Sequence, residues 1–474
     1  MSVAKYVELA EQIKSQIRSN VWSIGSKLPS LRKQTELSGL SLMTVVNAYR
    51  LLETQGWVVS HSRSGYVVAP PAYNVTTSQV ARRLHITESV HINDFVFDIL
   101  QANRTKKAVV NFGFAYPDPM LYPQDKVNKS LVQAARTMPT SHALDNLPPG
   151  NETLRNIIAK RYAAQGMNIS PEEIVITAGA LEALNLSLQS VTKAGDWVVI
   201  ESPAFYGALQ ALERLNLRAL SINTHPTEGI DLDSLEKALQ THDVKACWLM
   251  TNFQNPLGFT LADEKKKRLV SMLTEHQVYL IEDDVYGELY YGASKPLPAK
   301  AFDTQGMTLH CSSFSKSLVA GFRIGWVAAG NRALPIQKLQ LMSTLSTSAP
   351  VQLALANYLS TRHYEIHLRQ LRRTLEQRKF QTWQLLQQSL PKGCDAYYST
   401  GGYFIWVVLP EHVNTTNLYR VLLQDNISIA PGEMFAPDQQ FTHGFRLNAS
   451  QDMTESVKGA IKRLGEQIAN MLSC

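Results

Sequence analysis

Residues 311–326 read Cys-Ser-Ser-Phe-Ser-Lys-Ser-Leu-Val-Ala-Gly-Phe-Arg-Ile-Gly-Trp, and the interpretation of the larger part of the chain starts from this stretch. It places Lys316 among small hydroxyl residues, directly after a strand-like apolar run. A lysine in this setting can form a Schiff base. Three neighbouring side chains suit a phosphate group: Ser313, Ser315 and Arg323.

The same stretch fits two other descriptions. An isolated Ser-x-x-Lys sequence is most often an exposed lysine in a serine-rich loop. Ser313 and Lys316 also match the acyl-transfer pair of penicillin-binding enzymes, but the chain contains neither the Ser-Asp-Asn nor the Lys-Thr-Gly motif of those enzymes. The rest of the chain therefore has to decide what this lysine does.

Composition indicates a globular protein of two or more domains. The chain has 474 residues, of which 45% are hydrophobic and 18% charged. No run of apolar residues is long enough for a membrane span, and Lys5 and Glu8 interrupt any signal sequence, so we expect a cytoplasmic protein with no membrane contact. The cysteines lack metal-type spacing, which predicts neither a disulfide framework nor a metal site: Cys247, Cys311, Cys394 and Cys474.

The positive charge is concentrated at the start of the chain. Residues 1–70 hold eight Lys and Arg against four Glu, a net charge of 8 − 4 = +4, which leaves +2 of the total +6 for all other residues. A short basic domain before a nearly neutral large one suggests a nucleic-acid module.

The first seventy residues show the pattern of a winged helix-turn-helix. Apolar residues at helical spacing predict a first helix within residues 6–17. Ser30 and Ser41 are N-caps of two further short helices, joined by a turn that contains glycine. Residues 57–60 and 65–68 then predict the two strands of a wing.

Several motifs lie on these elements: Leu28-Pro-Ser-Leu-Arg32, Thr44-Val45, Ala48-Tyr49, Leu52, Gly56 and Arg63-Ser-Gly-Tyr66. Together they resemble the winged helix of the GntR family of transcription regulators. The resemblance implies binding to double-stranded DNA, with arginines at phosphates and Thr44 and Asn47 in the groove. The implied DNA-binding residues are Arg32, Lys33, Ser41, Thr44, Asn47 and Arg63.

One position departs from that family, whose members often carry an arginine directly after the serine of the recognition helix. Here Leu42 and Met43 follow Ser41. Affinity then has to come from dimerisation, from Lys33 or from apolar contacts with thymine methyl groups. The alternative for the whole segment is a small helical module for oligomerisation or protein docking.

We predict three parts of the chain. Residues 1–72 form the winged helix, and Pro70 and Pro71 end it. Residues 73–108 form a linker, in which apolar residues within 89–102 indicate a short docking helix. Residues 109–474 form the large domain.

The large domain alternates apolar strand patterns with helical stretches, which predicts a mostly parallel sheet covered by helices. Strands are expected at 173–177, 197–201, 246–251, 278–282 and 308–312. Ligands of such sheets gather at the carboxyl ends of the strands.

Each expected strand is followed by a segment suited to binding chemistry. Gly179 and Ala180 open a helix whose N-terminus suits a phosphate, and Tyr206 could stack on a pyridine ring. Residues 252–258 place Asn255 beside a proline, and Asp283 and Tyr286 follow the fourth strand. Taken singly, Tyr206 could be core filler and Asp283 a helix cap.

These segments precede Lys316 in the order found in fold-type I aminotransferases, and the chain from about residue 109 resembles that family. The resemblance implies pyridoxal 5'-phosphate (PLP) as cofactor, held as an internal aldimine on Lys316, with Ser313 and Arg323 at its phosphate. It further implies that Asp283 pairs with the pyridine nitrogen. Asn255 and Tyr286 match residues that bond the ring oxygen.

The C-terminal part resembles the smaller subdomain of the same family through Gly401-Gly-Tyr-Phe-Ile-Trp406 and Phe445-Arg-Leu-Asn448. There Arg446 would grip an α-carboxylate as a bidentate fork. A structural ion pair is the alternative for Arg446. The expected fold is therefore α/β: a winged helix-turn-helix, a large mostly parallel sheet domain and a small α/β subdomain.

Two positions bear on how the cofactor and substrate would be held. The family usually has a tyrosine a few residues before Gly150 that reaches the phosphate in the neighbouring subunit, and residues 144–149 around Asn146 contain none. A cross-subunit phosphate contact is thus not expected. Conversely, Asn255 is what working aminotransferases carry, whereas many regulators of this build have an aromatic residue there.

The combination resembles the MocR subfamily of bacterial transcription regulators. The hypothesis is a homodimeric, PLP-dependent regulator that binds a DNA operator and senses a small amino compound, or PLP itself, through aldimine exchange at Lys316. The competing hypothesis is a genuine aminotransferase with an appended DNA-binding head. A third is a scaffold that binds no cofactor.

Overall fold

The computed structural model describes residues 5–18, 21–22, 25–61, 65–69, 85–88, 90–105, 110–139, 146–438 and 440–473. The chain divides into two compact units, the head (Met1–Ala81) and the body (Arg82–Cys474). In the described part, none of the helices is both long and apolar enough to cross a membrane. The three-part division at residues 72 and 108 stays a prediction, and the first part of the expected linker, 73–84, lies outside the described residues.

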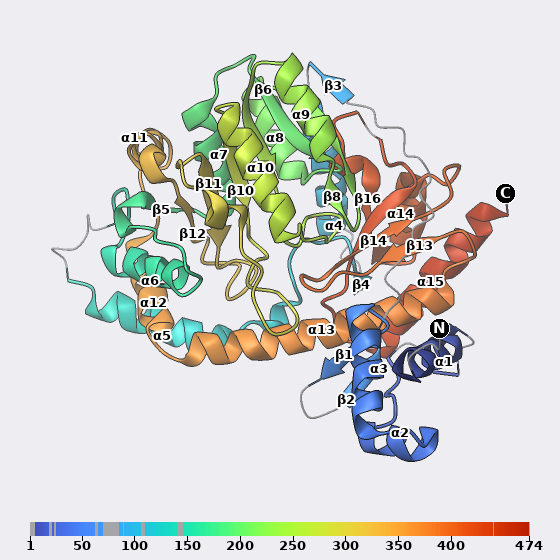
Figure 1. The fold of residues 1–474 in the computed structure, drawn as a ribbon. Coiled ribbons are helices and arrows are strands. Elements are labelled where there is room, and N and C mark those ends of the chain that lie inside the picture. The colour runs from blue at the N-terminus through green and yellow to red at the C-terminus, as the bar shows by residue number, and fades with distance from the viewer. Residues whose placement is uncertain are drawn as a thin grey trace. The chain divides into compact units, whose positions relative to one another are not determined.

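The head is the expected winged helix-turn-helix (Figure 1). Ser30 caps the second helix by accepting a hydrogen bond from the Lys33 backbone at 3.3 Å, and Ser41 caps the third through the Thr44 backbone at 3.2 Å. Gly39 ends the second helix in the left-handed conformation, with φ at 66°. The elements are α1 (Lys5–Arg18), α2 (Leu31–Ser38), α3 (Leu42–Thr54), β1 (Val58–His61) and β2 (Gly65–Val68).

The core of the head is built on one face of α3. The buried residues of that helix are spaced three and four apart: Val45, Ala48, Tyr49 and Leu52. The Tyr49 ring meets the Tyr66 ring edge-on at 5.0 Å, and its hydroxyl donates to the Pro29 carbonyl at 3.0 Å. The wing and the helices therefore share one hydrophobic core.

The body is organised around a central sheet of order β3-β7-β6-β9-β10-β11-β12-β5, with β8 beside β7 (Figure 1). The strands from β7 to β11 run parallel, whereas β12 is antiparallel to both its neighbours, β11 and β5. Their bounds are β3 (His85–Thr87), β5 (Ile174–Thr177), β6 (Trp197–Ser202), β7 (Arg218–His225), β8 (Gly229–Ile230), β9 (Val244–Leu249), β10 (Tyr279–Asp283), β11 (Thr308–Ser313) and β12 (Gly325–Ala328).

The mostly parallel sheet and all five expected strands are confirmed, with ends shifted by at most two residues. The strands β7 and β12 were not predicted. β7 mixes apolar and polar residues without strict alternation, and β12 begins with a glycine inside the lysine stretch. Both are held by pairing with distant strands rather than by a local pattern.

Helices cover the sheet and the second half of the body. α7 contacts β5, β9, β10, β11 and β12, whereas α10 contacts β10. The helices are α4 (Asn93–Thr105), α5 (Gln124–Thr137), α6 (Glu152–Ala163), α7 (Ala180–Val191), α8 (Tyr206–Arg214), α9 (Leu232–Thr241), α10 (Asp263–Glu275), α11 (Ala333–Ser343), α12 (Ala349–Leu359), α13 (His363–Ser389), α14 (Thr415–Gln424) and α15 (Glu455–Leu472). Short 3-10 turns occur at Pro119–Leu121, Pro171–Glu173, Ala299–Phe302, Gly330–Arg332 and Gly432–Phe435.

A second, smaller sheet follows the long helix α13, drawn in orange in Figure 1. Its order is β13-β14-β17-β16, and it packs with α13, α14 and the 3-10 turn Gly432–Phe435. A separate parallel pair, β4 with β15, ties the start of the large domain to this subdomain. The strands are β4 (Val110–Asn111), β13 (Asp395–Tyr397), β14 (Phe404–Val408), β15 (Ile427–Ser428), β16 (Ala430–Pro431) and β17 (Gly444–Asn448).

The segment before the large domain contains the helix α4, which lies within the body and contacts α8. The Ile92 backbone N–H donates to the Glu213 carboxylate at 2.7 Å, next to the start of this helix. Val96 and Ile99 are buried. This segment is therefore anchored on the body.

We expect Leu52→Ala to destabilise the head alone. Leu52 is fully buried in the head's own core, so the lost contacts and the cavity should cost about 2–5 kcal/mol of unfolding free energy. Calorimetry of the full chain should show the head's transition at lower temperature and the body's transition unchanged. Leu37→Ala, at a leucine that is 64% exposed, is the matched control and should move neither. A shift of both transitions by Leu52→Ala would contradict independent unfolding.

Candidate functional site

Lys316 lies in the turn between β11 and β12, just beyond the carboxyl end of β11. Its side chain is half-buried, and the amine Nζ donates a hydrogen bond to the Ala115 carbonyl at 2.5 Å. The amine also lies 3.6 Å from the centre of the Tyr116 ring. Within the described residues, no carboxylate comes within ion-pair distance of this amine. The exposed surface lysine considered from the sequence therefore does not describe its position.

Burial lowers the pKa of the Lys316 amine to about 7, and the positive charges of Arg446 and Arg323 act in the same direction. The carboxylate of Asp283 opposes them by favouring the charged amine. An amine with this pKa is substantially neutral near pH 7. It is therefore available as a nucleophile where an ordinary lysine is not.

A cradle for an anion lies beside the lysine, at the start of α7. Gly179 has φ at +88°, and a Cβ atom there would lie 2.4 Å from the Arg323 guanidinium, so only glycine permits this approach. No side chain caps the first turn of α7. The Ser315 hydroxyl lies 3.4 Å from the same guanidinium. Ser313, two residues earlier in the chain, is buried. Free N–H groups, a guanidinium and hydroxyls together suit a phosphate.

The opposite side of the site holds a carboxylate and an amide that each have one buried atom without a hydrogen-bond partner. Asp283 is the last residue of β10, and its buried Oδ1 atom has no hydrogen-bond partner in the structure. Burial raises the pKa of its carboxyl group to about 7. The buried amide nitrogen Nδ2 of Asn255 also lacks a partner. Tyr286, buried in the turn after β10, adds a hydroxyl to this region.

Arg446 extends from β17 of the small subdomain into the same region. It is 1% exposed, and its guanidinium donates to the Asn255 side-chain oxygen at 2.7 Å and to the Gly113 carbonyl at 2.6 Å. The guanidinium carbon lies 4.3 Å from the centre of the Phe404 ring, and the Nε atom has no partner. No carboxylate pairs with it in the described part of the chain. Its observed partners in the described residues are an amide oxygen and a backbone carbonyl.

Tyr206 is the first residue of α8 and is half-buried. Its ring lies 4.8 Å from the Phe205 ring and 6.2 Å from the Phe435 ring. Its hydroxyl is electrostatically coupled to Arg446 and Tyr116, although burial is the main reason that its pKa is raised. The structure thus brings Tyr206 to the group around Lys316 rather than into the interior of the body.

Sequence reasoning missed three contributors. Ala115 and Tyr116, which meet the lysine amine, lie in the segment between β4 and the 3-10 turn Pro119–Leu121. Glu201, at the end of β6, accepts hydrogen bonds from the Met250 backbone at 3.2 Å and the Gln254 side chain at 3.3 Å. Burial raises the pKa of Glu201 well above its usual value. A single glutamate after a strand carried no signal of this role.

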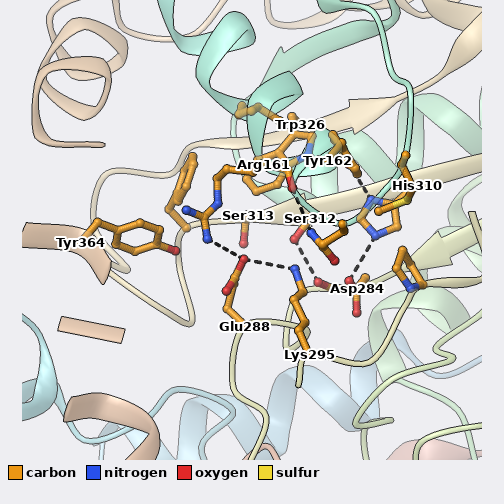
Figure 2. A pocket seen from close by; sticks show the side chains of 15 residues that line it. Arg161, Tyr162, Asp284, Glu288, Lys295, His310, Ser312, Ser313, Trp326 and Tyr364 are labelled. Carbon is orange, nitrogen blue, oxygen red and sulfur yellow. Dashed lines mark hydrogen bonds and ion pairs between the residues drawn. The ribbon is translucent and has the colours of Figure 1, made fainter. Parts of the chain in front are cut away.

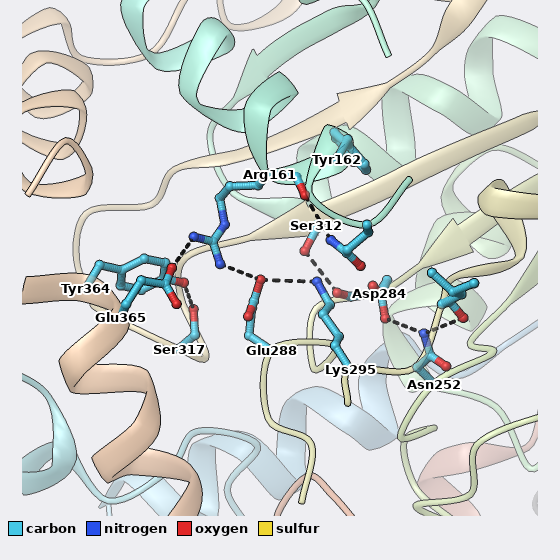
Figure 3. Close-up of polar contacts among 12 residues, drawn as sticks. Arg161, Tyr162, Asn252, Asp284, Glu288, Lys295, Ser312, Ser317, Tyr364 and Glu365 are labelled. Atoms are coloured by element: carbon cyan, nitrogen blue, oxygen red, sulfur yellow. Dashed lines mark hydrogen bonds and ion pairs between the residues drawn. The ribbon is translucent and has the colours of Figure 1, made fainter. Parts of the chain in front are cut away.

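A polar network surrounds Asp284, the residue after Asp283, which bonds His310 (Figure 2) and accepts a hydrogen bond from the Asn252 amide at 3.2 Å (Figure 3). The Trp326 indole donates to the Tyr162 hydroxyl at 3.0 Å, and the same hydroxyl shares a hydrogen bond with His310 Nδ1 at 2.7 Å. The other ring nitrogen of His310 lies 3.1 Å from the Asp284 carboxylate. This chain of bonds fixes the strand ends on which the site is built.

A small cavity adjoins this network and is lined by Arg161, Lys295, Glu288 and Ser313 (Figure 2). Its volume of about 30 Å³ is enough for about two water molecules. Burial of Glu288 opposes ionisation, but Lys295, Arg161 and Arg372 hold the pKa of Glu288 well below its usual value. The Glu288 carboxylate lies 2.8 Å from Arg161 and 3.1 Å from Lys295. These charges satisfy one another, so the cavity is bordered by a closed ion-pair cluster and leaves no charged group unpaired for a ligand among Arg161, Lys295 and Glu288.

Asn146 lies in the segment before Gly150, where members of the aminotransferase family usually have a tyrosine. Its amide nitrogen donates to the Ser346 hydroxyl at 2.8 Å and to the Thr347 carbonyl at 2.6 Å. This side chain therefore serves the packing of its own chain.

Most of the residues predicted to meet DNA lie on the head's surface. Arg32, Lys33 and Asn47 are exposed, and Lys33 pairs with Glu36 at 3.0 Å. The hydroxyls of Ser41 and Thr44 lie 2.8 Å apart, so both belong to the cap of α3. Arg63 lies outside the described residues.

The fold and site define the chain as a winged-helix protein with an aminotransferase-type body, and sequence models of two families agree. "Bacterial regulatory proteins, gntR family" matches residues 5–68, and "Aminotransferase class I and II" matches residues 120–464, well over half of the chain. The chain is 55% identical over 470 residues to the uncharacterized HTH-type transcriptional regulator YdcR of Escherichia coli (strain K12), covering 99% of this chain and 100% of that protein. It therefore belongs to the GntR-type regulators with an aminotransferase body, the MocR-like subfamily.

Solved aminotransferases share the fold of the body. The kynurenine aminotransferase of Pyrococcus horikoshii, solved in complex with PMP, is 27% identical, with a TM-score of 0.75. LysN, the α-aminoadipate aminotransferase of Thermus thermophilus, solved with N-(5'-phosphopyridoxyl)-L-leucine, is 26% identical, with a TM-score of 0.73. Each similarity covers 80% of this chain and 95% of the other. Aminotransferases of this fold depend on PLP.

The lowered pKa of Lys316 predicts how its reactivity depends on pH. When PLP is added to cofactor-free protein, the rate of the visible absorbance change should follow the neutral fraction of the amine and rise through about pH 7. Asp283→Asn removes the negative charge that favours the charged amine, so the midpoint should move to lower pH. Stopped-flow absorbance across the neutral range measures both midpoints. A midpoint near that of a free lysine, or no shift in the variant, would contradict the assignment of these groups.

Proposed function

We propose that the chain is a homodimeric transcription regulator that binds a double-stranded DNA operator through its head and holds PLP at Lys316. A small amino compound, or PLP itself, is sensed there. The observation that carries the proposal is that one chain joins a winged helix to a body whose lysine is surrounded by buried polar atoms without partners. Neither half alone would argue for a ligand-controlled DNA-binding protein.

The residues around Lys316 fit PLP at each end of the molecule. The anion cradle of Gly179, Ser315 and Arg323 suits the phosphate, and the unpartnered Asp283 Oδ1 suits a protonated ring nitrogen. The unpartnered Asn255 Nδ2 suits the ring oxygen. The Asp283 and Asn255 atoms would otherwise remain buried without a hydrogen bond, at a cost in free energy. Tyr286 adds a hydroxyl beside the ring oxygen, and Tyr206 adds an aromatic face.

PLP supplies an aldehyde that reacts with amines and a ring that withdraws electrons when its nitrogen is protonated. The chain's own groups prepare for this chemistry. Asp283, when ionised, would hold a proton at the ring nitrogen, and the neutral fraction of the Lys316 amine would be the nucleophile available to the aldehyde. Arg446 would receive the carboxylate of an amino acid through its free Nε atom and its second guanidinium nitrogen.

The ligand would control DNA binding by binding with unequal affinity to two arrangements of the regulator, one of which is competent to bind DNA. An amino compound changes the regulator only if it binds the DNA-competent arrangement better or worse than the other one. Two heads related by a two-fold axis imply an operator with paired half-sites.

Covalent attachment at Lys316 is the first test of this function. Borohydride reduction should fix PLP on Lys316 and nowhere else, and Lys316→Ala should reduce incorporation to background while the body's melting transition persists. Lys379 is the internal control. Burial lowers its pKa to about 7 as well, but its amine donates to Ser399 and Gly401 at 2.7–3.0 Å and has no route to an aldehyde. Mass spectrometry of the reduced protein locates the label, and a label on Lys379 or on the variant would refute the assignment.

The response to amino compounds is the second test. We expect at least one amino acid to change the affinity of the full chain for its operator, and Arg446→Lys to weaken that response about 10- to 100-fold because the bidentate grip is lost. Fluorescence anisotropy of labelled operator DNA, titrated with single amino acids, measures it. An unchanged response in the variant would exclude Arg446 as the carboxylate receptor.

A genuine aminotransferase is the second candidate. It is favoured by the hydrogen bond between Arg446 and Asn255, because this bond places the residue proposed for the substrate carboxylate beside the residue proposed for the cofactor ring. Mixing the PLP-loaded protein with amino-acid and 2-oxo-acid pairs separates the candidates. Product formed over many cycles supports an enzyme, whereas one spectral change together with altered DNA affinity supports a regulator.

A further inference from the structure

The outward face of α3 carries an unusual set of side chains. Met43, Asn47 and Arg50 are all exposed and follow one another at four- and three-residue spacing, so they form one stripe along the helix. The stripe lies opposite the buried set that begins with Val45 and Ala48. It is the surface that this helix offers to a partner.

The first turn of that surface is apolar. Met43 is 68% exposed and Leu42 is 49% exposed. Both are large apolar side chains that the head's own core does not bury. The hydroxyls of the neighbouring Ser41 and Thr44 bond each other in the helix cap. No lysine or arginine occurs between residues 41 and 49, and Arg50 is the first cation of the helix.

The surroundings of this turn favour a nucleic acid as the partner. The second helix of a helix-turn-helix places its N-terminal residues against base edges in the major groove. Arg32 and Lys33, in the first turn of α2, are exposed cations suited to the phosphates on either side. An apolar turn beside exposed cations matches a groove that displays thymine methyl groups between two rows of phosphates.

We propose that Leu42 and Met43 recognise thymine methyl groups and that Asn47 recognises adenine, so that each operator half-site has A·T pairs where the first two turns of α3 meet the bases. The inference rests on the DNA-binding function proposed above and adds its sequence preference. The thymine C5-methyl is the apolar group that the major groove displays, and an asparagine amide matches adenine N6 and N7. Guanine, which arginine and lysine read best, has no counterpart in these two turns.

The test uses the full chain and duplex DNA. Tight-binding sequences are first selected from a random duplex pool, and each thymine of the best sequence is then replaced singly by deoxyuridine, which lacks only the methyl group. We expect affinity to fall about fourfold at one or two positions of each half-site, the effect of one buried methyl group. In Met43→Ala, the difference between thymine and uracil should vanish at one of these positions.

Matched variants separate base recognition from folding. Leu37→Ala removes an exposed leucine from α2 and should leave the thymine preference intact. Asn47→Ala should relax the preference for adenine at a neighbouring position. Each variant's melting curve, compared with that of the unaltered chain, reports whether the head remains folded.

The outcomes are distinct. Equal binding of thymine- and uracil-containing operators, or a Met43→Ala variant that weakens both equally, would overturn the inference while DNA binding stands. If no duplex is enriched at all, the regulator function itself fails. Self-association of the full chain that is lost in Met43→Ala without any change in DNA preference would instead assign this turn to a second copy and overturn the inference.

Discussion

The site in the body depends on how β12 joins β11 to β5. Gly325 of β12 lies opposite Ser313 on one side and opposite Thr177 on the other. A Cβ atom at Gly325 would lie 2.5 Å from the backbone nitrogen of Ala180, so glycine is what allows the start of α7 to approach this strand. That approach brings the anion cradle beside the turn that carries Lys316. A larger residue would separate the phosphate-binding groups from the lysine.

The charged groups around this junction have few protein partners. The Asp283 carboxyl and the Lys316 amine are each shifted towards neutrality by burial, and the Arg446 guanidinium is buried with one nitrogen unbonded. Buried groups of this kind lower stability unless something else bonds them. A small molecule with a phosphate, a ring nitrogen and an amino-acid carboxylate would satisfy these atoms together. The arrangement is that of a binding site, which distinguishes it from the self-satisfied cluster around Glu288.

The head and the body each have a hydrophobic core of their own. The body holds the residues expected of an aminotransferase, and the head holds those expected of a DNA reader. A regulator and an enzyme would differ in the event that ligand binding triggers rather than in the side chains that bind the ligand. If the head binds DNA as proposed, the apolar first turn of α3 contributes preference among sequences, whereas the exposed cations contribute affinity through phosphates.

The sequence by itself determined the local features: the caps at Ser30 and Ser41, the five strand patterns and the order of motifs up to Lys316. These depend on interactions within a few residues, which a linear pattern records. Tertiary structure alone decided that β12 runs antiparallel between β11 and β5, that Glu201 supports the Gln254 loop, and that Arg446 bonds Asn255 across 191 residues of chain. Such contacts arise when the large sheet and the small subdomain pack together, and no local propensity encodes them.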